Sequence, residues 1–557
     1  MNKFINLFNG QKYISIKEKN TIIKEYKKNY LKFKRNIFSY LFKTKRTFIK
    51  YYKNIDNYIS DNNRIYINNE YNRNKKLLDN IKGYKLDNEQ LKCVINEEDS
   101  CLIIAGAGSG KSLTLIAKIR YLIETKYIEE KEILCISFTK ESSNKLKNEL
   151  KTYYNYDIDV FTFHKLALNI LKDNNIEFNI AQEDLLNYLV DEFYSTLIHQ
   201  IPILEKLTIK YFFGNLNKCY EDISPNDMKV LKKTVITFIR LFKANNQYEN
   251  EIYTYIKKVN KNDYILLLNI ITIYNLYKIE LESQNEIDFD DMIKKATNLV
   301  KNEELNKKYK YILIDEYQDT SLVRVNLIQE IINKLNCKLI VVGDDFQSIY
   351  KFSGCNINVF LDFKKYFKES NFFFITNNYR NSQELLNVAG NFIMKNKKHI
   401  KKDLNAHKHL NKPIKIIYYK NQKEAFNNLL KKIDTNNLLI LGRNNNDIYK
   451  VIDNYNTLNL KYLTVHKSKG LEAENVILIN LENNVMGFPS KLENHKITNL
   501  INNDIEYIKY EEERRLFYVA LTRSKNYVFL LVNQIKPSQF VKEILNDYSE
   551  QIEVLSI

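Results

Sequence analysis

The feature that most constrains the fold of this 557-residue chain is a short apolar strand that runs into a polar or glycine-containing turn and then into a helix. This unit recurs along the chain. Strands that alternate with helices pair in parallel, because each crossover helix brings the chain back to the same end of the sheet. We therefore predict an α/β protein with parallel sheets covered by helices. The expected strands are residues 101–105, 133–138, 160–163, 311–315, 339–344, 372–376, 475–481 and 527–532.

A strand-poor block interrupts this alternation. Residues 170–300 read as helical, so we expect an inserted helical subdomain there, with residues 170–286 as its bounds. The first sheet domain then consists of residues 86–169 and 287–370, and the second of residues 371–557. The chain has only 12 glycines and 5 prolines, which argues for few flexible linkers.

One strand end has the pattern of a phosphate-binding loop. In the stretch IIAGAGSGKSLTLIAKIRYLI, Ala105 stands where this pattern usually has glycine. Backbone N–H groups from Gly106 to Lys111 can wrap a phosphate chain, and the N-terminus of the next helix adds its positive end. We expect Lys111 to reach the β- and γ-phosphates of ATP and Ser112 to bind Mg²⁺. The expected nucleotide-binding residues of this loop are Ala105, Gly106, Ala107, Gly108, Ser109, Gly110, Lys111 and Ser112.

Another strand, YILIDEYQDTS (residues 311–321), ends in adjacent carboxylates. A metal nucleotide bound at Lys111 needs an acidic partner at a neighbouring strand end. We expect Asp315 to hold Mg²⁺ through water, and Glu316 to orient and deprotonate the attacking water. A strand-end ion pair is the alternative for either residue alone.

The net charge of +18 is concentrated at the N-terminus. Residues 1–85 contain 21 Lys and Arg against 6 Asp and Glu, whereas the remaining residues are nearly balanced. Basic and aromatic residues are interleaved in KFKRNIFSYLFKTKRTFIKYYKN, which suits a phosphate backbone with stackable bases. Amphipathic helices packed on the main body explain the same pattern, and both interpretations can hold together. We expect a basic, mostly helical extension that binds nucleic acid or a protein partner.

The cysteines and the lengths of the apolar runs indicate the cellular compartment of the protein. None of the six cysteines forms a C-x-x-C pair, which favours reduced core thiols over a zinc or iron–sulfur site. The first residues lack the apolar segment of a signal peptide, and no apolar run reaches the length of a membrane span. We expect a cytoplasmic protein without a membrane partner.

Residues 86–531 resemble the superfamily 1 DNA helicases of the UvrD/Rep type, and within them the helicase IV-like members. Several motifs follow the family's order along the chain. The resemblance implies two RecA-like P-loop NTPase domains with ATP in the cleft between them. The motifs are LDNEQ, GAGSGKS, ISFTKESSNKLKNEL, FTFHKLA, YILIDEYQDTS, VVGDDFQSIYKFSG, NNYRNS, LTVHKSKGLEAENV and EEERRLFYVALTRSK.

The resemblance assigns further roles at the ATP site. Gln90 of LDNEQ corresponds to the glutamine that reads the adenine edge, and Tyr379 of NNYRNS to the tyrosine that stacks on adenine. Glu472 corresponds to the residue that binds the ribose. Gln347 is expected to sense the γ-phosphate. Arg380 and Arg523 are expected to reach the transferred phosphoryl group from across the cleft, so hydrolysis depends on closure.

Other motif residues are expected to contact DNA by the same resemblance. Stacking on aromatic rings tolerates any sequence, since every base has a π-face. For the aromatic residues, packing in the protein core is the alternative. The expected DNA-binding residues are Phe138, Thr162, His164, Tyr350, Phe352 and His466.

The resemblance implies an ATP hydrolase that moves 3′→5′ on single-stranded DNA. It couples hydrolysis to duplex unwinding, an isomerisation of DNA, in repair, recombination or replication. Its expected partners are single-stranded and tailed duplex DNA. We expect a monomer or weak oligomer that associates with the nucleoid when working.

One departure from the family leaves an alternative open. Residues 381–463 are too few for the large accessory domain of UvrD and Rep, so a small or vestigial insertion is expected at about 390–460. The alternative function is an ATP-driven nucleic-acid-binding switch, or a protein-displacing translocase without processive unwinding. An inactive relative is disfavoured because Lys111, Asp315, Glu316 and the two arginines are all present.

Overall fold

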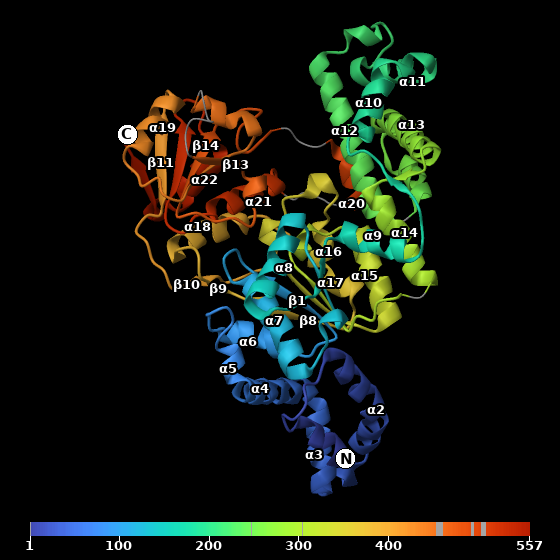
Figure 1. The fold of residues 1–557 in the computed structure, drawn as a ribbon, viewed down its shortest axis with the longest axis vertical. Coiled ribbons are helices and arrows are strands. Elements are labelled where there is room, and N and C mark those ends of the chain that lie inside the picture. The colour runs from blue at the N-terminus through green and yellow to red at the C-terminus, as the bar shows by residue number, and fades with distance from the viewer. Residues whose placement is uncertain are drawn as a thin grey trace.

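The computed structural model describes residues 2–246, 248–303, 305–452, 460–491, 495–502 and 508–556. Figure 1 shows a helical N-terminal unit at the bottom of the view and the first sheet domain in the middle. The second sheet domain lies at the upper left, and a helical subdomain lies at the upper right. The expected fold class, two parallel-sheet α/β domains with a helical insertion and a helical N-terminal extension, is confirmed.

The first sheet has six parallel strands in the order β3-β2-β6-β7-β1-β8. Helices α6, α7 and α8 cover one face, and α9, α14 and α15 cover the other, so the central strands are apolar on both sides. The strands are β1 (Ser100–Ala105), β2 (Ile133–Ile136), β3 (Asp159–Phe161), β6 (Tyr311–Ile314), β7 (Lys338–Gly343) and β8 (Ser370–Ile375). The helices are α6 (Asn88–Ile95), α7 (Lys111–Lys126), α8 (Lys140–Tyr154), α9 (Phe163–Asp173), α14 (Phe289–Asn302) and α15 (Leu322–Leu335).

The second sheet has six parallel strands in the order β13-β12-β14-β15-β11-β16. Helices α18, α21 and α22 pack on one face and α19 on the other. The strands are β11 (Ile414–Tyr419), β12 (Leu438–Gly442), β13 (Lys461–Thr464), β14 (Asn475–Leu481), β15 (Val528–Asn533) and β16 (Ile552–Leu555). The helices are α18 (Gln383–Ile393), α19 (Gln422–Leu430), α21 (Glu511–Leu521) and α22 (Gln539–Asp547).

The eight strands expected from the sequence are present, but β11, β12, β13 and β16 were not among them. Their sequences are IKIIYY, LLILG, KYLT and IEVL, and three of the four contain a charged residue. Strands β11 and β12 lie in the interval where a small insertion was expected. The described residues of that interval therefore contribute two strands to the second sheet.

The helical subdomain is built from four longer helices, α10 (Leu185–Ser195), α11 (Pro202–Phe213), α12 (Pro225–Asn245) and α13 (Lys261–Ser283), around one apolar core. By length and composition α13 could cross a membrane. However, 56% of its apolar window is buried, and Leu267, Ile270 and Ile273 are core residues. Its apolar character is that of a core helix. The short helix α20 (Asn499–Asn502), which follows β14 in the chain, packs on α12 (Figure 1).

The N-terminal unit contains α2 (Ile16–Arg35), α3 (Lys43–Lys53), α4 (Ile55–Arg73) and α5 (Lys75–Leu78). The Tyr13 hydroxyl and the Ile16 N–H donate to the Glu98 carboxylate, both at 2.9 Å, and the Ser15 hydroxyl donates to Asp99 at 2.8 Å. Glu98 and Asp99 immediately precede β1. The unit is thus fixed at the amino ends of the strands, opposite the phosphate-binding loop.

All six cysteines are free thiols. Five are buried and Cys219 is exposed. The described part of the chain holds no group of three or more His, Cys, Asp or Glu side chains arranged to bind a metal ion.

Candidate functional site

The phosphate-binding loop connects β1 to α7. Its turn requires glycine at Gly108 and Gly110, because φ is +73° and +84° at these positions. The Ser109 hydroxyl donates to the carbonyl of Gly106 at 2.9 Å and holds the turn closed. Lys111 is the first residue of α7. The loop therefore places backbone N–H groups, a helix N-terminus and the Lys111 ammonium at one strand end, as a phosphate site requires.

The paired carboxylates follow β6 at the same edge of the sheet. Glu316 has φ +51°, a left-handed backbone that costs a residue other than glycine about 1 kcal/mol or more. Its N–H donates to Oδ1 of Asp315 at 2.9 Å. Burial and the charge of Glu316 raise the pKa of Asp315. Burial also opposes the ionisation of Glu316, but Lys111 and Lys469 outweigh it and lower the pKa of Glu316. Lys111 and Lys469 therefore favour an ionised Glu316 at neutral pH.

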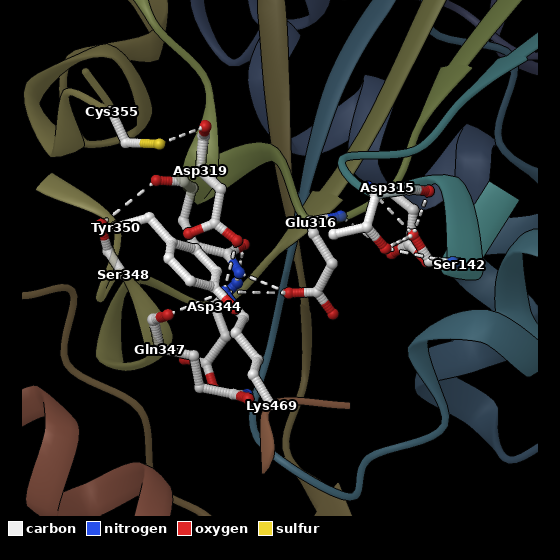
Figure 2. A network of polar contacts seen from close by, with 12 residues as sticks. Ser142, Asp315, Glu316, Asp319, Asp344, Gln347, Ser348, Tyr350, Cys355 and Lys469 are labelled. Atoms are coloured by element: carbon white, nitrogen blue, oxygen red, sulfur yellow. Dashed lines mark hydrogen bonds and ion pairs between the residues drawn. The ribbon is translucent and has the colours of Figure 1, made fainter. Parts of the chain in front are cut away.

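Lys469, which precedes Gly470 in the second domain, reaches into this carboxylate cluster (Figure 2). Its Nζ forms an ion pair with Asp319 and lies 3.6 Å from Oε2 of Glu316. It also donates to the carbonyl of Gln347 at 2.8 Å and lies 5.2 Å from the centre of the Tyr350 ring. Burial opposes the charge of Lys469, but the two carboxylates outweigh it and raise the pKa of the ammonium. One buried cation thus contacts the carboxylate, glutamine and aromatic parts of the site.

Two arginines of the expected catalytic set come from segments beyond the first domain. Arg523 is 1% exposed, and its Nη2 donates to Oε1 of Gln347 at 3.2 Å. Burial and the nearby Arg380 lower the pKa of Arg523. Arg380 forms an ion pair with Glu472 at 2.8 Å, and a Cβ placed on Gly108 lies only 2.6 Å from the Cβ of Arg380. The expected catalytic residues are therefore gathered around one loop, while the role of each stays a prediction.

The residues expected at adenine lie beside the loop. Gln90 accepts a hydrogen bond from the N–H of Asp87 and donates one to the carbonyl of Ser109, both at 3.1 Å. The Tyr379 ring is 57% exposed, and its hydroxyl donates to Asp87 at 2.6 Å. The Tyr379 N–H donates to the carbonyl of Gly108 at 2.9 Å. Gln90 and Tyr379 therefore share Asp87 as a partner and both hold the loop. Their contact with adenine, and that of Glu472 with ribose, stay predictions.

A large groove runs between the helical subdomain and the second sheet domain, with a volume of about 2020 Å³. Residues of α12 line one side and residues around β13, η10 (Asn445–Lys450) and α21 line the other. Its basic lining residues are Lys229, Lys232, Lys233, Arg240, Lys351, Arg443, Lys450, Lys467 and Lys496, against the acidic residues Asp191, Asp447, Glu512 and Glu513. The groove is therefore positively charged.

Three of the expected DNA-binding residues line this groove: Tyr350, Phe352 and His466. The Phe352 ring is 47% exposed and lies edge-on to His466, with ring centres 5.5 Å apart. Tyr350 donates from its hydroxyl to the carbonyl of His466 at 3.0 Å. Phe138 stacks on the inner side of Tyr350, with ring centres 5.4 Å apart and planes 18° apart. These rings form a half-open wall rather than a closed core.

Thr162 and His164 do not line the groove. The Thr162 hydroxyl caps α9 by accepting the N–H of Lys165 at 3.2 Å. The His164 ring packs on Phe289 with ring centres 4.6 Å apart. Burial and the charge of Arg324 lower the pKa of His164 to about 3, so its ring is neutral at physiological pH. Contact of these two residues with DNA stays a prediction.

Lys469 and Arg324 were not among the site residues expected from the sequence. Arg324 lies over the Phe138 ring at 5.2 Å and donates to the carbonyl of Asp319 at 3.2 Å. The only available signal was position within or just after a motif. Lys469 stands in LTVHKSKG, and Arg324 follows DEYQDTS by three residues.

The chain is similar to several curated DNA helicases. It is 26% identical to DNA helicase IV of Escherichia coli (strain K12) over 495 residues, which is 84% of this chain and 71% of that protein. It is 32% identical over 345 residues to ATP-dependent DNA helicase Rep of Buchnera aphidicola subsp. Schizaphis graminum (strain Sg), covering 60% of this chain and 48% of Rep. It is 29% identical over 321 residues to ATP-dependent DNA helicase PcrA of Staphylococcus aureus (strain Mu50 / ATCC 700699), covering 56% of this chain and 40% of PcrA. The match thus spans less than half of Rep and of PcrA.

Family models match both sheet domains. The model of the UvrD-like helicase C-terminal domain matches residues 452–534. The model of the UvrD/REP helicase N-terminal domain matches residues 86–368, which is half of the chain and includes the phosphate-binding loop and the carboxylate pair. The chain belongs to the UvrD/REP helicase family.

Proposed function

We propose that this protein is an ATP-dependent DNA helicase or translocase that couples ATP hydrolysis to movement along single-stranded DNA. The observation that carries the proposal is Lys469, which contacts Glu316 and Asp319 on one side and the groove residue Tyr350 on the other. A single side chain thus joins the hydrolytic carboxylates to an aromatic wall suited to stacked bases.

The residues around the phosphate-binding loop fit ATP. Lys111 and the loop N–H groups bind its β- and γ-phosphates, and Glu316 accepts the proton of the attacking water. In the transition state negative charge is spread over the oxygens of the transferred phosphoryl group and develops on the leaving oxygen, and Arg380 and Arg523 stabilise that charge. Gln347, bonded to Arg523, reports the presence of the γ-phosphate to the second domain.

Mg²⁺ fits the same site by its donor set. The Asp315 carboxylate and the exposed Ser112 hydroxyl supply hard oxygen ligands, the kind that Mg²⁺ prefers together with nucleotide phosphates. When bound, the ion neutralises phosphate charge. Burial raises the pKa of Asp315 against the opposing charges of Lys111 and Lys469, and a divalent cation bound there would favour the ionised carboxylate.

Single-stranded DNA occupies the basic groove in this proposal. Lysines and arginines on both walls neutralise phosphates, and Tyr350 and Phe352 stack on bases. Closure of the two sheet domains on ATP changes the spacing of these walls, and hydrolysis reverses it. Movement in the 3′→5′ direction, work in repair, recombination or replication, a monomeric or weakly oligomeric state and a cytoplasmic, nucleoid-associated location are carried over from the family.

Unwinding of tailed duplexes tests the proposal. We expect strand separation of a duplex with a 3′ single-stranded tail in the presence of ATP and Mg²⁺, and none with a blunt duplex. The 5′-tailed duplex is the matched control for direction. Absence of both unwinding and translocation on any tailed substrate would refute the proposal.

A second candidate function is favoured by the interval at 390–460. Its described residues contribute strands β11 and β12 to the second sheet. An interval whose described residues form no large accessory lobe fits a translocase or ATP-driven switch that displaces bound proteins without processive unwinding. If ATP drives displacement of streptavidin from a 3′- or 5′-biotinylated strand while tailed duplexes stay paired, this second function holds.

A further inference from the structure

The described residues of the N-terminal unit carry a surface that the proposed function does not use. Between Lys27 and Lys53 the chain has ten basic residues and no acidic residue. Five of these basic residues belong to the second half of α2 and five to α3, and the turn η2 (Ile37–Leu41) links the two helices. The basic residues are Lys27, Lys28, Lys32, Lys34, Arg35, Lys43, Lys45, Arg46, Lys50 and Lys53, and we call them the basic arm.

The charges of the basic arm are not compensated within the described part of the protein. Nine of the ten side chains are exposed, and only Lys45 is half-buried. None of the ten forms an ion pair with a carboxylate of the described residues, whereas Lys19, nearer the start of α2, pairs with Asp56. So many like charges on two adjacent helices repel each other, and a polyanion relieves that repulsion.

Exposed aromatic rings accompany these charges. Phe38 is 70% exposed, Phe42 55% and Tyr40 45%, all at the turn between α2 and α3. Lys45 lies 4.5 Å from the centre of the Phe42 ring. Rings open to solvent beside cations offer the combination that binds phosphates and unpaired bases together.

The scaffold beneath the surface is rigid. Phe48 and Ile49 of α3 are buried in the core of the unit, and the rings of Tyr30 and Tyr52 stack 4.3 Å apart between α2 and α3. The unit is in turn bonded to the first sheet domain through Glu98 and Asp99. The basic arm is therefore held in a fixed position on the first sheet domain.

That position is remote from the groove. The unit docks at the amino ends of the first sheet's strands, and Figure 1 shows α2 and α3 at the opposite end of the molecule from α12 and α20. Groove residues and basic-arm residues therefore form two separate positive surfaces.

We propose that the basic arm is a second nucleic-acid-binding site, which holds the DNA phosphate backbone outside the motor groove. The proposal relies on the proposed function only for the choice of DNA as the polyanion. The cations extend from Lys27 to Arg35, about 12 Å of helix, and again along α3. Cations spread over this length match a long polyanion. A lipid surface would instead be contacted only by the apolar residues of the turn.

The test uses charge reversal at four exposed arm positions, Lys32→Glu, Arg35→Glu, Lys43→Glu and Arg46→Glu, in the full chain. A matched control reverses four exposed lysines elsewhere: Lys172→Glu, Lys218→Glu, Lys431→Glu and Lys432→Glu. Both variants change the net charge equally. Binding to a 60-nucleotide single strand and a 60-base-pair duplex is measured by fluorescence anisotropy from 50 to 300 mM KCl.

We expect the arm variant to bind at least one of these DNAs about 10-fold or more weakly at 50 mM KCl. We also expect the slope of log K against log [KCl] to become shallower by about 2 to 4, since each phosphate contact contributes about 0.7 to 0.9. The control should keep the wild-type slope. A second variant, Phe38→Ser with Phe42→Ser, should weaken binding of the single strand and not of the duplex.

Slopes of the arm variant equal to those of the wild type and the control would overturn the proposal. Wild-type binding to vesicles with 30% anionic phospholipid, lost in the arm variant while the DNA slopes stay unchanged, would assign the surface to membranes instead. ATP hydrolysis stimulated by a 12-nucleotide strand is read in parallel, because it tests the groove alone. If the 12-nucleotide strand does not stimulate ATP hydrolysis by the wild type, the proposed function is refuted, whereas the proposal for the basic arm is not.

Discussion

At the scale of single residues, the central assignment is Glu316 as the group that accepts the proton of the attacking water. Its carboxylate is kept ionised by Lys111 and Lys469, and its left-handed backbone fixes its direction. Glu316→Gln removes the base and preserves the shape. We expect kcat for ATP hydrolysis to fall about 100-fold or more, with the Kd for ATP within a few fold of the wild type. Glu177→Gln, an exposed change, serves as control. A kcat within about 10-fold of the wild type would remove Glu316 from this role.

Lys469 is expected to couple the groove to the hydrolytic site. Lys469→Met removes the cation shared by Asp319, Glu316 and the Tyr350 ring. We expect the ratio of kcat with and without saturating oligo-dT to fall towards 1. Lys469→Arg should keep part of that ratio, because it keeps the charge. Lys467→Met, a neighbouring groove lysine, should raise only the DNA concentration needed for half-stimulation. An unchanged ratio in Lys469→Met would mean that coupling runs through other contacts.

At the scale of elements, the aromatic wall of the groove depends on the segment between β7 and the turn η9 (Lys351–Ser353). Tyr350 presents its ring there, supported by Phe138 behind it. Tyr350→Ala should weaken single-strand binding by about 1–3 kcal/mol, roughly 5- to 150-fold in Kd. Tyr350→Phe keeps the ring and should lose much less affinity for single-stranded DNA. Equal losses in both variants, measured by anisotropy, would assign the effect to the hydroxyl bond with His466 rather than to stacking.

Two histidines at the ends of elements predict a pH dependence of stability. Burial lowers the pKa of both His164 and His466 to about 3, with Arg324 acting on the first and Arg443 and Lys469 on the second. Both rings are neutral in the folded protein, whereas in the unfolded chain they take up protons near pH 6.5. Protonation therefore favours the unfolded chain. As the pH is lowered from 6.5, the free energy of unfolding should therefore decrease, by up to about 1.4 kcal/mol per pH unit for each ring.

Urea unfolding between pH 6.5 and 5 measures this effect. The double variant His164→Gln with His466→Gln should show a shallower decline than the wild type. Parallel declines in the two proteins would mean that other groups control acid stability in this range.

Most of the fold could be predicted from the sequence because its central strands are buried on both faces and read as continuous apolar runs. Strands such as β13, with the sequence KYLT, escaped prediction because their apolar run is too short to stand out in the sequence. The phosphate loop and carboxylates were predictable because strand ends in parallel sheets converge. The contact of Lys469 with Asp319 could not be predicted, since 150 residues separate them and only tertiary packing brings them together.

At the scale of the whole molecule, the two sheet domains meet at the phosphate-binding loop. The second half of the chain places Arg380 against the loop and Arg523 against Gln347, while the groove lies between that half and the helical subdomain. Any change in the separation of the domains therefore acts on both sites at once. In the proposed function, the nucleotide state thereby sets the geometry of the groove, which a DNA motor requires.

The measurement that tests this account most directly is the steady-state rate of ATP hydrolysis with and without single-stranded DNA, with Lys111→Ala and Glu316→Gln as controls for contaminating activity. We predict stimulation of about 10-fold or more by oligo-dT, absent in both variants. A wild-type rate that is unchanged by saturating DNA would contradict the coupling of the two sites.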